Sequence, residues 1–119
     1  MSWRLDHVQL AMPAGGEDAC RAFWVDVLGM TEVEKPAGLA GRGGLWLRKG
    51  AVELHLGVAE PFAPATKAHP CFAVPGLDTL AEALEAAGHT VRWDSEIAGR
   101  RRFFTDDPFG NRVEFMAEA

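Results

Sequence analysis

Two histidines and two glutamates recur at matching positions in the two halves of this 119-residue chain. His7 and His69 are 62 residues apart, and Glu53 and Glu114 are 61 residues apart. Imidazole nitrogens and carboxylate oxygens are ligands for zinc and, with water added, for nickel, cobalt, manganese or ferrous iron. The spacing therefore predicts a duplicated module that carries one divalent metal site, and these four ligands do not select the metal.

The elements that must position these residues follow the same order in both halves. In the first half, period-two alternation predicts a first strand and a period of 3.6 predicts an amphipathic helix, followed by three short strands. The expected ranges are a strand over residues 5–12, a helix over 17–28, and strands over 31–34, 44–48 and 51–57. Lys49 and Gly50 are expected to form the hairpin turn between the last two strands.

In the second half, Pro75 and Gly76 end the first strand, Asp78 is expected to cap a helix, and Gly88 follows that helix. The expected ranges are a strand over residues 69–74, a helix over 77–87, strands over 90–93, 101–105 and 112–116, and a turn over 107–111. The chain thus predicts an α+β fold of two tandem βαβββ modules in one domain of residues 1–119. Module one covers residues 1–60, a connector covers 61–68, and module two covers 69–119.

Strand alternation also predicts which side chains share a face. Residues two apart project to the same side, so Glu53 and His55 lie opposite Leu54 and Leu56. By the same argument Glu114 lies opposite its apolar neighbours Val113 and Phe115. If the two modules pair to curl one mixed sheet into a cup, with the helices on the outer face, the four candidate ligands meet on the concave side.

Three other residues are candidates for this face. His55 could replace or supplement Glu53 as a ligand, hydrogen-bond to Glu53, or contact substrate, and we favour the last two roles. We favour a solvated strand face for the run from Arg100 to Arg102, but a guanidinium turned inward would bind a substrate carboxylate or phosphate. Alternation favours Arg102 for that role. Trp46 could stack on a flat substrate or belong to the core.

Charge and hydrophobicity limit the classes of molecule that this chain can bind. The formal net charge is −5, and no apolar run approaches the roughly 20 residues that span a bilayer. We therefore expect a small-molecule partner, with neither nucleic acid nor membrane. The first ten residues lack the basic and apolar segments of a signal peptide, so we expect a cytoplasmic protein, in which Cys20 and Cys71 are buried free thiols.

Four segments carry a resemblance to a known family: LDHVQLAMP, AVELHLG, HPCFAVPGLDTLAEALEAAG and FFTDDPFGNRVEF. Together they resemble the vicinal oxygen chelate superfamily, which includes glyoxalase I, bleomycin-resistance proteins, extradiol dioxygenases, methylmalonyl-CoA epimerase and fosfomycin-resistance thiol transferases. The resemblance covers essentially the whole chain, and DDPFGNRVEF is its most specific part. It implies a metal bound by His7, Glu53, His69 and Glu114, which fills the four ligand positions of the glyoxalase I pattern.

What the resemblance implies for activity is a glyoxalase I-like lyase or isomerase. Such an enzyme converts the hemithioacetal of an α-oxoaldehyde to an α-hydroxyacyl thioester through an enediolate held on the metal, with Glu114 or Glu53 as general base. The alternatives are a thiol transferase acting on an antibiotic epoxide, an iron-dependent extradiol dioxygenase, and a metal-free drug-binding protein of the bleomycin-resistance type. We expect a homodimer, with the site either within one chain or shared by two, and the thiol cosubstrate is not specified.

Overall fold

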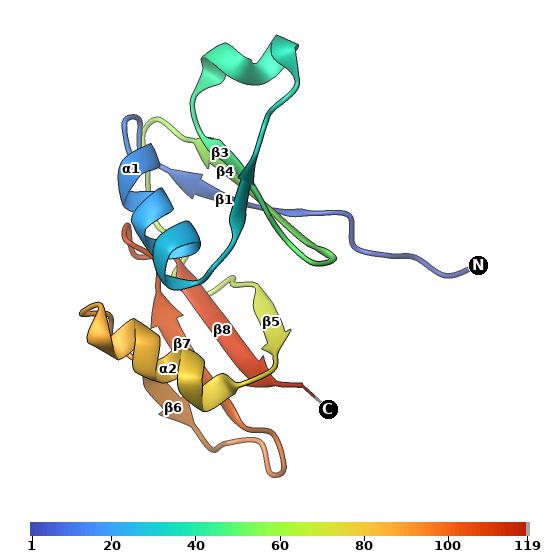
Figure 1. Ribbon diagram of the computed structural model, residues 1–119, viewed down its shortest axis with the longest axis vertical. Helices are drawn as coiled ribbons and strands as arrows, with labels where there is room; N and C mark the ends of the chain where they lie inside the picture. The colour runs from blue at the N-terminus through green and yellow to red at the C-terminus, as the bar shows by residue number, and fades with distance from the viewer. Residues whose placement is uncertain (119) are drawn as a thin grey trace. The chain divides into compact units, whose positions relative to one another are not determined.

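The structure is a computed structural model that describes residues 1–118, and its chain divides into two compact units. We call Met1–Ala63 unit 1 and Pro64–Ala119 unit 2. Each unit contains one four-stranded sheet and one main helical segment, blue to green in unit 1 and yellow to red in unit 2 (Figure 1). The predicted α+β fold of two βαβββ modules is confirmed. That the two modules form a single domain stays a prediction.

Unit 1 contains a four-stranded mixed sheet with the strand order β1-β4-β3-β2, in which β1 runs parallel to β4. Its elements are β1 (Val8–Met12), α1 (Glu17–Cys20), the π-helix η1 (Arg21–Val27), β2 (Thr31–Val33), the 3₁₀-helix η2 (Ala37–Arg42), β3 (Leu45–Lys49) and β4 (Val52–Val58). The predicted helix over 17–28 corresponds to α1 and η1 together. Periodicity did not predict η2, which is rich in glycine and has no buried residue.

The core of unit 1 is made by the apolar positions that alternation selected on the strands. Leu10, Met12, Leu54 and Leu56 are all buried, and the Sγ of Cys20 in α1 lies 4.0 Å from the Sδ of Met12 in β1. The helix therefore packs against the sheet beside β1, where burial of apolar surface stabilises the unit. Alternation places Val52 on the same face as Leu54, but Val52 is exposed, because it is the first residue after the hairpin turn.

Gly44 of unit 1 occupies a position where no other residue type fits. Gly44 has a φ of +83°, and a Cβ built on it would lie 2.1 Å from the carbonyl oxygen of Leu56. Its N–H donates to Oε2 of Glu17 at 2.8 Å, which ties the loop before β3 to the start of α1. Only glycine combines this backbone conformation with so close an approach to β4.

Unit 2 repeats the strand arrangement, with the order β5-β8-β7-β6 and β5 parallel to β8. Its elements are β5 (Cys71–Val74), α2 (Leu77–Ala86), β6 (Arg92–Asp94), β7 (Arg102–Asp106) and β8 (Arg112–Ala117). The prediction that Asp78 caps α2 is wrong, because Gly76, with a φ of +64°, occupies the N-cap. Asp78 lies within the helix, and its carboxylate accepts hydrogen bonds from Arg101.

The turn between β7 and β8 is organised by one buried carboxylate. Oδ1 of Asp107 accepts hydrogen bonds from the backbone N–H groups of Phe109 and Asn111, and Oδ2 accepts one from Nδ2 of Asn111. Oδ1 of Asn111 in turn accepts from the N–H of Ala65, which holds the start of unit 2 against this turn. The predicted turn is present, and its polar groups satisfy one another.

Two strand boundaries bear on the site. His7 immediately precedes β1 and His69 lies two residues before β5, so both histidines lie outside the strands that were predicted to include them. Pairing with β4 starts only at Val8, and pairing with β8 starts only at Cys71. The β3–β4 turn is also displaced by one residue, since Lys49 pairs with Val52 and leaves residues 50–51 as the turn.

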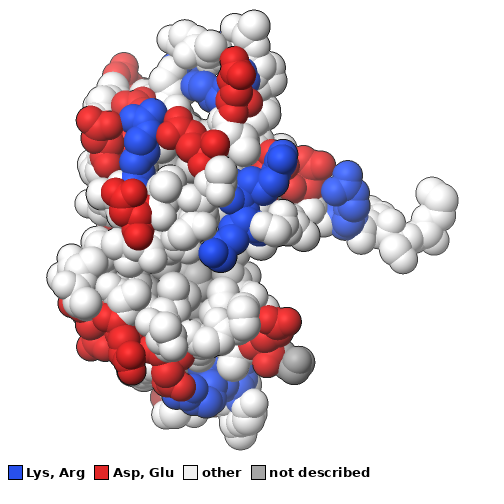
Figure 2. Space-filling view, in the orientation of Figure 1, with Lys and Arg blue, Asp and Glu red and all other residues white. Residues whose placement is uncertain are grey.

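The surface carries charges of both signs. Figure 2 shows lysine and arginine side chains scattered among aspartate and glutamate side chains on the face presented there. None of the helices within residues 1–118 has the length and apolar character needed to cross a membrane.

Candidate functional site

In unit 2 the predicted ligands His69 and Glu114 are in direct contact. Nε2 of His69 lies 2.9 Å from Oε1 of Glu114, and Nδ1 of the same ring lies 2.9 Å from the carbonyl oxygen of Lys67. A carbonyl only accepts, so Nδ1 must donate, and Nε2 faces the carboxylate either as an N–H of the imidazolium or as a bare nitrogen. A proton or a metal ion placed between Nε2 of His69 and Oε1 of Glu114 would satisfy both atoms. Two ligand atoms 2.9 Å apart can both reach one metal ion at roughly 2.0–2.2 Å.

Arg102 holds the other side of the Glu114 carboxylate. Its Nη1 donates to Oε2 of Glu114 and its Nη2 donates to Oδ1 of Asp94, both at 3.2 Å. Desolvation raises the pKa of the buried Glu114, but the hydrogen bonds from His69 and Arg102 outweigh it and hold this pKa below its ordinary value. Glu114 is therefore an ionised carboxylate in a fixed orientation.

Cys71 pairs with Glu114 across the sheet and is a free thiol. The prediction that both cysteines are buried holds for Cys20 and is wrong for Cys71, because β5 is an edge strand of its sheet. Although the residue as a whole is exposed, desolvation of the sulfur and the nearby Glu114 charge raise the pKa of the Cys71 thiol to about 11. The thiol is consequently protonated at neutral pH, which argues against a nucleophilic role.

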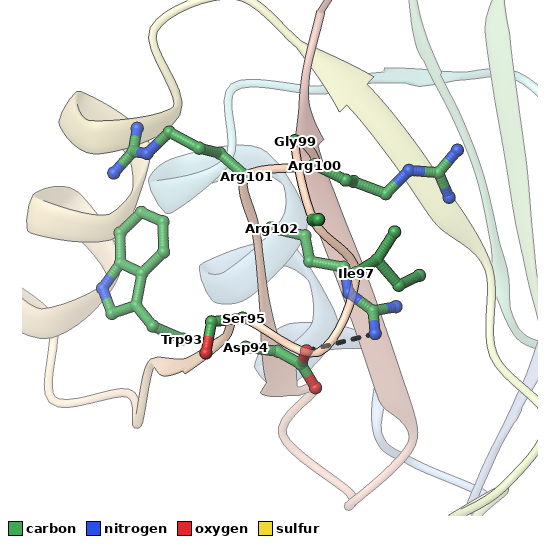
Figure 3. A pocket seen from close by; sticks show the side chains of 9 residues that line it. Trp93, Asp94, Ser95, Ile97, Gly99, Arg100, Arg101 and Arg102 are labelled. Carbon is green, nitrogen blue, oxygen red and sulfur yellow. Dashed lines mark hydrogen bonds and ion pairs between the residues drawn. The ribbon is translucent and has the colours of Figure 1, made fainter.

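A hollow of about 560 Å³ lies beside Arg102, lined by the loop that joins β6 to β7 and by the adjoining ends of these strands. Figure 3 shows Arg100 and Arg101 pointing away from each other, while the guanidinium of Arg102 lies against Asp94. Arg101 is paired with Asp78. Arg102 is the one of the three that turns toward the Glu114 carboxylate, and its predicted contact with substrate stays a prediction.

In unit 1 three aromatic rings form a stack. The rings of His7 and His55 have centroids 4.2 Å apart, and those of His55 and Trp46 have centroids 3.9 Å apart with an angle of 3° between their planes. His55 is buried, so desolvation, followed by repulsion from His7, lowers its pKa below the ordinary value for histidine. Trp46 uses one face of its ring for His55, and its predicted stacking on substrate stays a prediction.

Some polar atoms around this ring stack have hydrogen-bond partners and others do not. Nε2 of His55 is buried, has no hydrogen-bond partner among residues 1–118, and lies 3.8 Å from Oε1 of Glu53, too far for a hydrogen bond. Glu53 accepts a hydrogen bond from Nη2 of Arg48 at 3.3 Å, and Nδ1 of His7 contacts Asp6 at 3.0 Å. The predicted ligands His7 and Glu53 thus lie beside a third group, His55, that sequence reasoning preferred to leave outside the ligand set.

Strand register shows which residues are equivalent in the two units. Two residues after the first histidine, Gln9 pairs with His55, whereas two residues after the second histidine, Cys71 pairs with Glu114. His55, not Glu53, therefore occupies the position of Glu114. The predicted equivalence of the two glutamates is wrong, because the stretch from the first strand to the fourth is three residues longer in unit 1 when it is measured by strand pairing.

The aromatic partners follow the same correspondence. Trp46 on β3 pairs with His55, and Phe104 on β7 pairs with Glu114. The ring of Phe104 in turn makes an edge contact with His69 at a centroid distance of 5.4 Å. Each unit thus presents a histidine before its first strand, a polar side chain on its fourth strand and an aromatic ring on its third strand.

The donor set fits a metal ion in its chemistry. Within residues 1–118 no group of three or more His, Cys, Asp or Glu gathers in one place to hold an ion. Each unit by itself offers a histidine paired with one further donor, and the unpartnered Nε2 of His55 and the Nε2 of His69 facing a carboxylate are both atoms that an ion would satisfy.

Comparison with known proteins gives one family. A family model described as the glyoxalase/bleomycin resistance protein/dioxygenase superfamily matches residues 4–115. No curated protein matches the chain.

Several solved structures share the fold. A protein of Bacillus anthracis assigned to the glyoxalase family is 42% identical, with a TM-score of 0.95, and the match covers 100% of this chain and 98% of that chain. Lactoylglutathione lyase of Agrobacterium tumefaciens is 25% identical, with a TM-score of 0.68 and coverage of 92% and 91%. The fosfomycin resistance protein FosX of Listeria monocytogenes, solved with Mn(II), is 15% identical, with a TM-score of 0.81 and coverage of 100% and 95%, a likeness of fold alone.

Proposed function

The chain belongs to the glyoxalase/bleomycin resistance protein/dioxygenase superfamily, and from this premise we propose that it is a metal-dependent enzyme of glyoxalase I-like lyase or isomerase type. The observation that carries the proposal is the repeated arrangement of donors. His69 contacts Glu114 at 2.9 Å, and His7 stacks on His55 at the equivalent positions of the other unit. A protein that only sequesters a drug has no need of such donors.

We propose that one divalent ion of zinc, nickel, cobalt, manganese or iron binds His7, His69, Glu114 and a fourth donor on β4, with Glu53 as the residue that the family pattern indicates. The bound ion supplies Lewis-acid stabilisation of the negative charge that develops on a substrate oxygen. Arg102 keeps Glu114 oriented and ionised through its hydrogen bond to Oε2. This support is the kind that raises both the affinity of a metal site and its precision.

The two glutamates are the groups that can accept a proton from the substrate carbon. Glu114 is fixed by His69 and Arg102, whereas the Glu53 side chain is 23% exposed and has one hydrogen bond, to Arg48 at 3.3 Å. Glu53 therefore has more freedom to approach a bound substrate. A carboxylate placed within hydrogen-bond reach of the acidic proton serves as a general base and later returns that proton to the neighbouring carbon.

Metal content tests this proposal. We expect about one divalent ion per chain, measured by mass spectrometry on protein made without an affinity tag and incubated with each candidate metal. His69→Ala and Glu114→Ala should remove the ion, while His89→Ala, a histidine outside the proposed set, should retain it. Isomerisation of the methylglyoxal hemithioacetals of several thiols should then depend on the metal.

The alternatives give different results. A protein that binds none of these metals is not an enzyme of the proposed type, and drug-binding titrations would then test the bleomycin-resistance alternative. Metal binding with turnover of a catechol that requires oxygen would identify a dioxygenase, and metal-dependent addition of a thiol to an epoxide would identify a thiol transferase.

We also propose a homodimer, because strands β1 and β5 are edges of their sheets and unpaired edges are commonly covered by association. Sedimentation should give twice the mass of one chain. Mixing His7→Ala chains with His69→Ala chains should restore about a quarter of the wild-type metal content if two chains share each site, and none if each site lies within one chain.

A further inference from the structure

One of the three consecutive arginines of unit 2 is left without a partner. Both Nη atoms of Arg101 donate to Asp78, and those of Arg102 donate to two other carboxylates. The guanidinium of Arg100 is exposed and has neither an ion pair nor a hydrogen bond with any of residues 1–118. Alternation along the strand favours Arg102 for binding an anion, whereas in the structure Arg100 is the arginine whose hydrogen-bond donors are free.

Two hydrogen bonds give the loop that carries Arg100 a defined shape. At its start, Oδ1 of Asp94 accepts a hydrogen bond from the backbone N–H of Glu96 at 2.8 Å. At its end, the carbonyl oxygen of Ile97 accepts one from the N–H of Arg100 at 3.2 Å, which closes a four-residue turn. Gly99, with a φ of +77°, supplies the backbone conformation that this turn needs. The first and last residues of such a turn lie within about 7 Å of each other, so Ile97 and Arg100 are neighbours.

The turn directs an apolar side chain and the free guanidinium to one side of the loop. Figure 3 shows Ile97 and Arg100 extending to that side, and Trp93 and Arg101 extending to the other. The charge of Arg100 also acts on the thiol of Cys71, which agrees with a guanidinium directed toward β5. Ile97 is 43% exposed, and it lines the hollow of about 560 Å³ together with Arg100. This volume is within the range of small-molecule sites, roughly 300–1,000 Å³.

The lining of the hollow is positively charged, although the chain as a whole is not. Three of the nine lining residues are arginines and only Asp94 is acidic, whereas the formal net charge of the chain is −5. Asp94 is already paired with Arg102. A guanidinium binds a carboxylate or a phosphate through two parallel hydrogen bonds, which a free Arg100 can supply. The lining therefore suits a small ligand that has one anionic group and an apolar body.

We propose that this hollow binds a small ligand through a carboxylate or phosphate group, with Arg100 as the anion-binding residue and Ile97 in contact with the apolar part of the ligand. Arg101 and Arg102 add positive charge to the lining, while their Nη atoms remain bonded to carboxylates of the protein. All of these residues belong to unit 2, and the site requires no metal ion. The inference is therefore independent of the proposed function.

Titration of the metal-free protein with matched probes tests the proposal. Benzoate and phenylphosphonate carry the same ring on different anionic groups, and benzyl alcohol carries the ring without a charge. We expect both anions, but not benzyl alcohol, to shift the NMR signals of the backbone amides of residues 97–100. The tighter of the two anions then shows whether the site prefers a carboxylate or a phosphate-type group.

Two adjacent arginines provide a variant and its matched control. We expect Arg100→Gln to weaken binding of the preferred anion about tenfold or more, because it removes the free charged donors. Arg101→Gln changes the net charge by the same amount one residue away, and it should weaken binding less than about twofold. Ile97→Ser should weaken binding of benzoate and leave binding of acetate, which has no ring, unchanged.

The side chain of Arg100 is exposed and unpaired among the described residues, so Arg100→Gln should unfold at the same urea concentration as the wild-type protein. Equal weakening of anion binding in Arg100→Gln and Arg101→Gln would show attraction by net charge alone and would overturn the inference. A wild-type protein that binds neither anion would overturn it as well. Neither result changes the expected metal content, which tests the proposed function separately.

Discussion

Units 1 and 2 share one strand order and one parallel pairing of first and fourth strands, yet they hold their polar residues by different forces. In unit 1 the fourth-strand residue His55 is neutral and lies between two rings. In unit 2 the equivalent Glu114 is ionised and lies between His69 and Arg102. The two units thus place a polar side chain at the same position of the sheet and hold it by different forces.

The comparison shows that two side chains at equivalent strand positions can be oriented by different interactions. An imidazole between aromatic faces is oriented by packing, which salt affects little. A carboxylate between an imidazole and a guanidinium is oriented by charge-assisted hydrogen bonds, which depend on the ionisation of each partner. The side chains at these two equivalent positions are therefore expected to respond differently to mutation and to pH.

The largest expected effect is a difference in stability between substitutions in the two loops that lead into the third strand of each sheet. Gly44 in unit 1 and Gly99 in unit 2 have similar φ values, +83° and +77°, but only Gly44 has a backbone atom where a Cβ would lie. We expect Gly99→Ala to cost about 1 kcal/mol of unfolding free energy and Gly44→Ala about 3 kcal/mol or more. Urea denaturation measures both, and equal losses would contradict the close approach to β4.

The next effect concerns how each donor is held. Arg102→Lys keeps the charge but loses the paired hydrogen bonds to Glu114 and Asp94, so we expect metal affinity to fall about tenfold. Trp46→Leu should produce a similar fall in unit 1 by removing one side of the ring stack. Arg101→Lys, whose side chain is paired with Asp78, is the control and should leave metal affinity unchanged.

The smallest expected effect is the pH dependence of stability in metal-free protein. The pKa of His55 is lowered on folding, so its contribution is present above pH 6.5, the ordinary value for histidine, and is lost as the pH falls below it. The groups that face it are His7, Glu53 and Asp6. The pKa of Glu114 is also lowered, so its contribution is present above about pH 4.5 and is lost as the pH falls further.

Thermal unfolding in the presence of a chelator should therefore show two steps of destabilisation on acidification. His55→Gln should abolish the step near neutral pH, and Glu114→Gln should abolish the step at lower pH. Two variants with identical pH profiles would contradict the assignment of one step to each unit.

Much of the local structure was predictable from the sequence. The helical segments and all eight strands lie within a few residues of their expected positions, because alternation and the 3.6-residue period each reflect burial of one face. Turn residues predicted the turn over 107–111 for the same reason that they form it, namely the hydrogen bonds of Asp107. The resemblance to the family was confirmed over residues 4–115.

Solvent exposure was less predictable. Trp3 is 97% exposed and Trp93 is 46% exposed, while Trp24 is 1% exposed. Trp24 belongs to an amphipathic helix whose periodicity predicts burial, whereas Trp3 precedes the first paired residue of β1 and Trp93 lies on the edge strand β6. Hydrophobicity alone did not distinguish these positions.

The sequence by itself determined the two βαβββ modules and the histidine that precedes the first strand of each, because alternation and helical periodicity are properties of neighbouring residues. Only the tertiary structure decided that His55 is the counterpart of Glu114, because the pairing of β1 with β4 joins residues 46 positions apart and depends on loop length as well as on strand pattern. Alternation places Glu53 and His55 on one face equally well. Register, ring stacking and burial then distinguish them, and these forces exist only once the strands have paired.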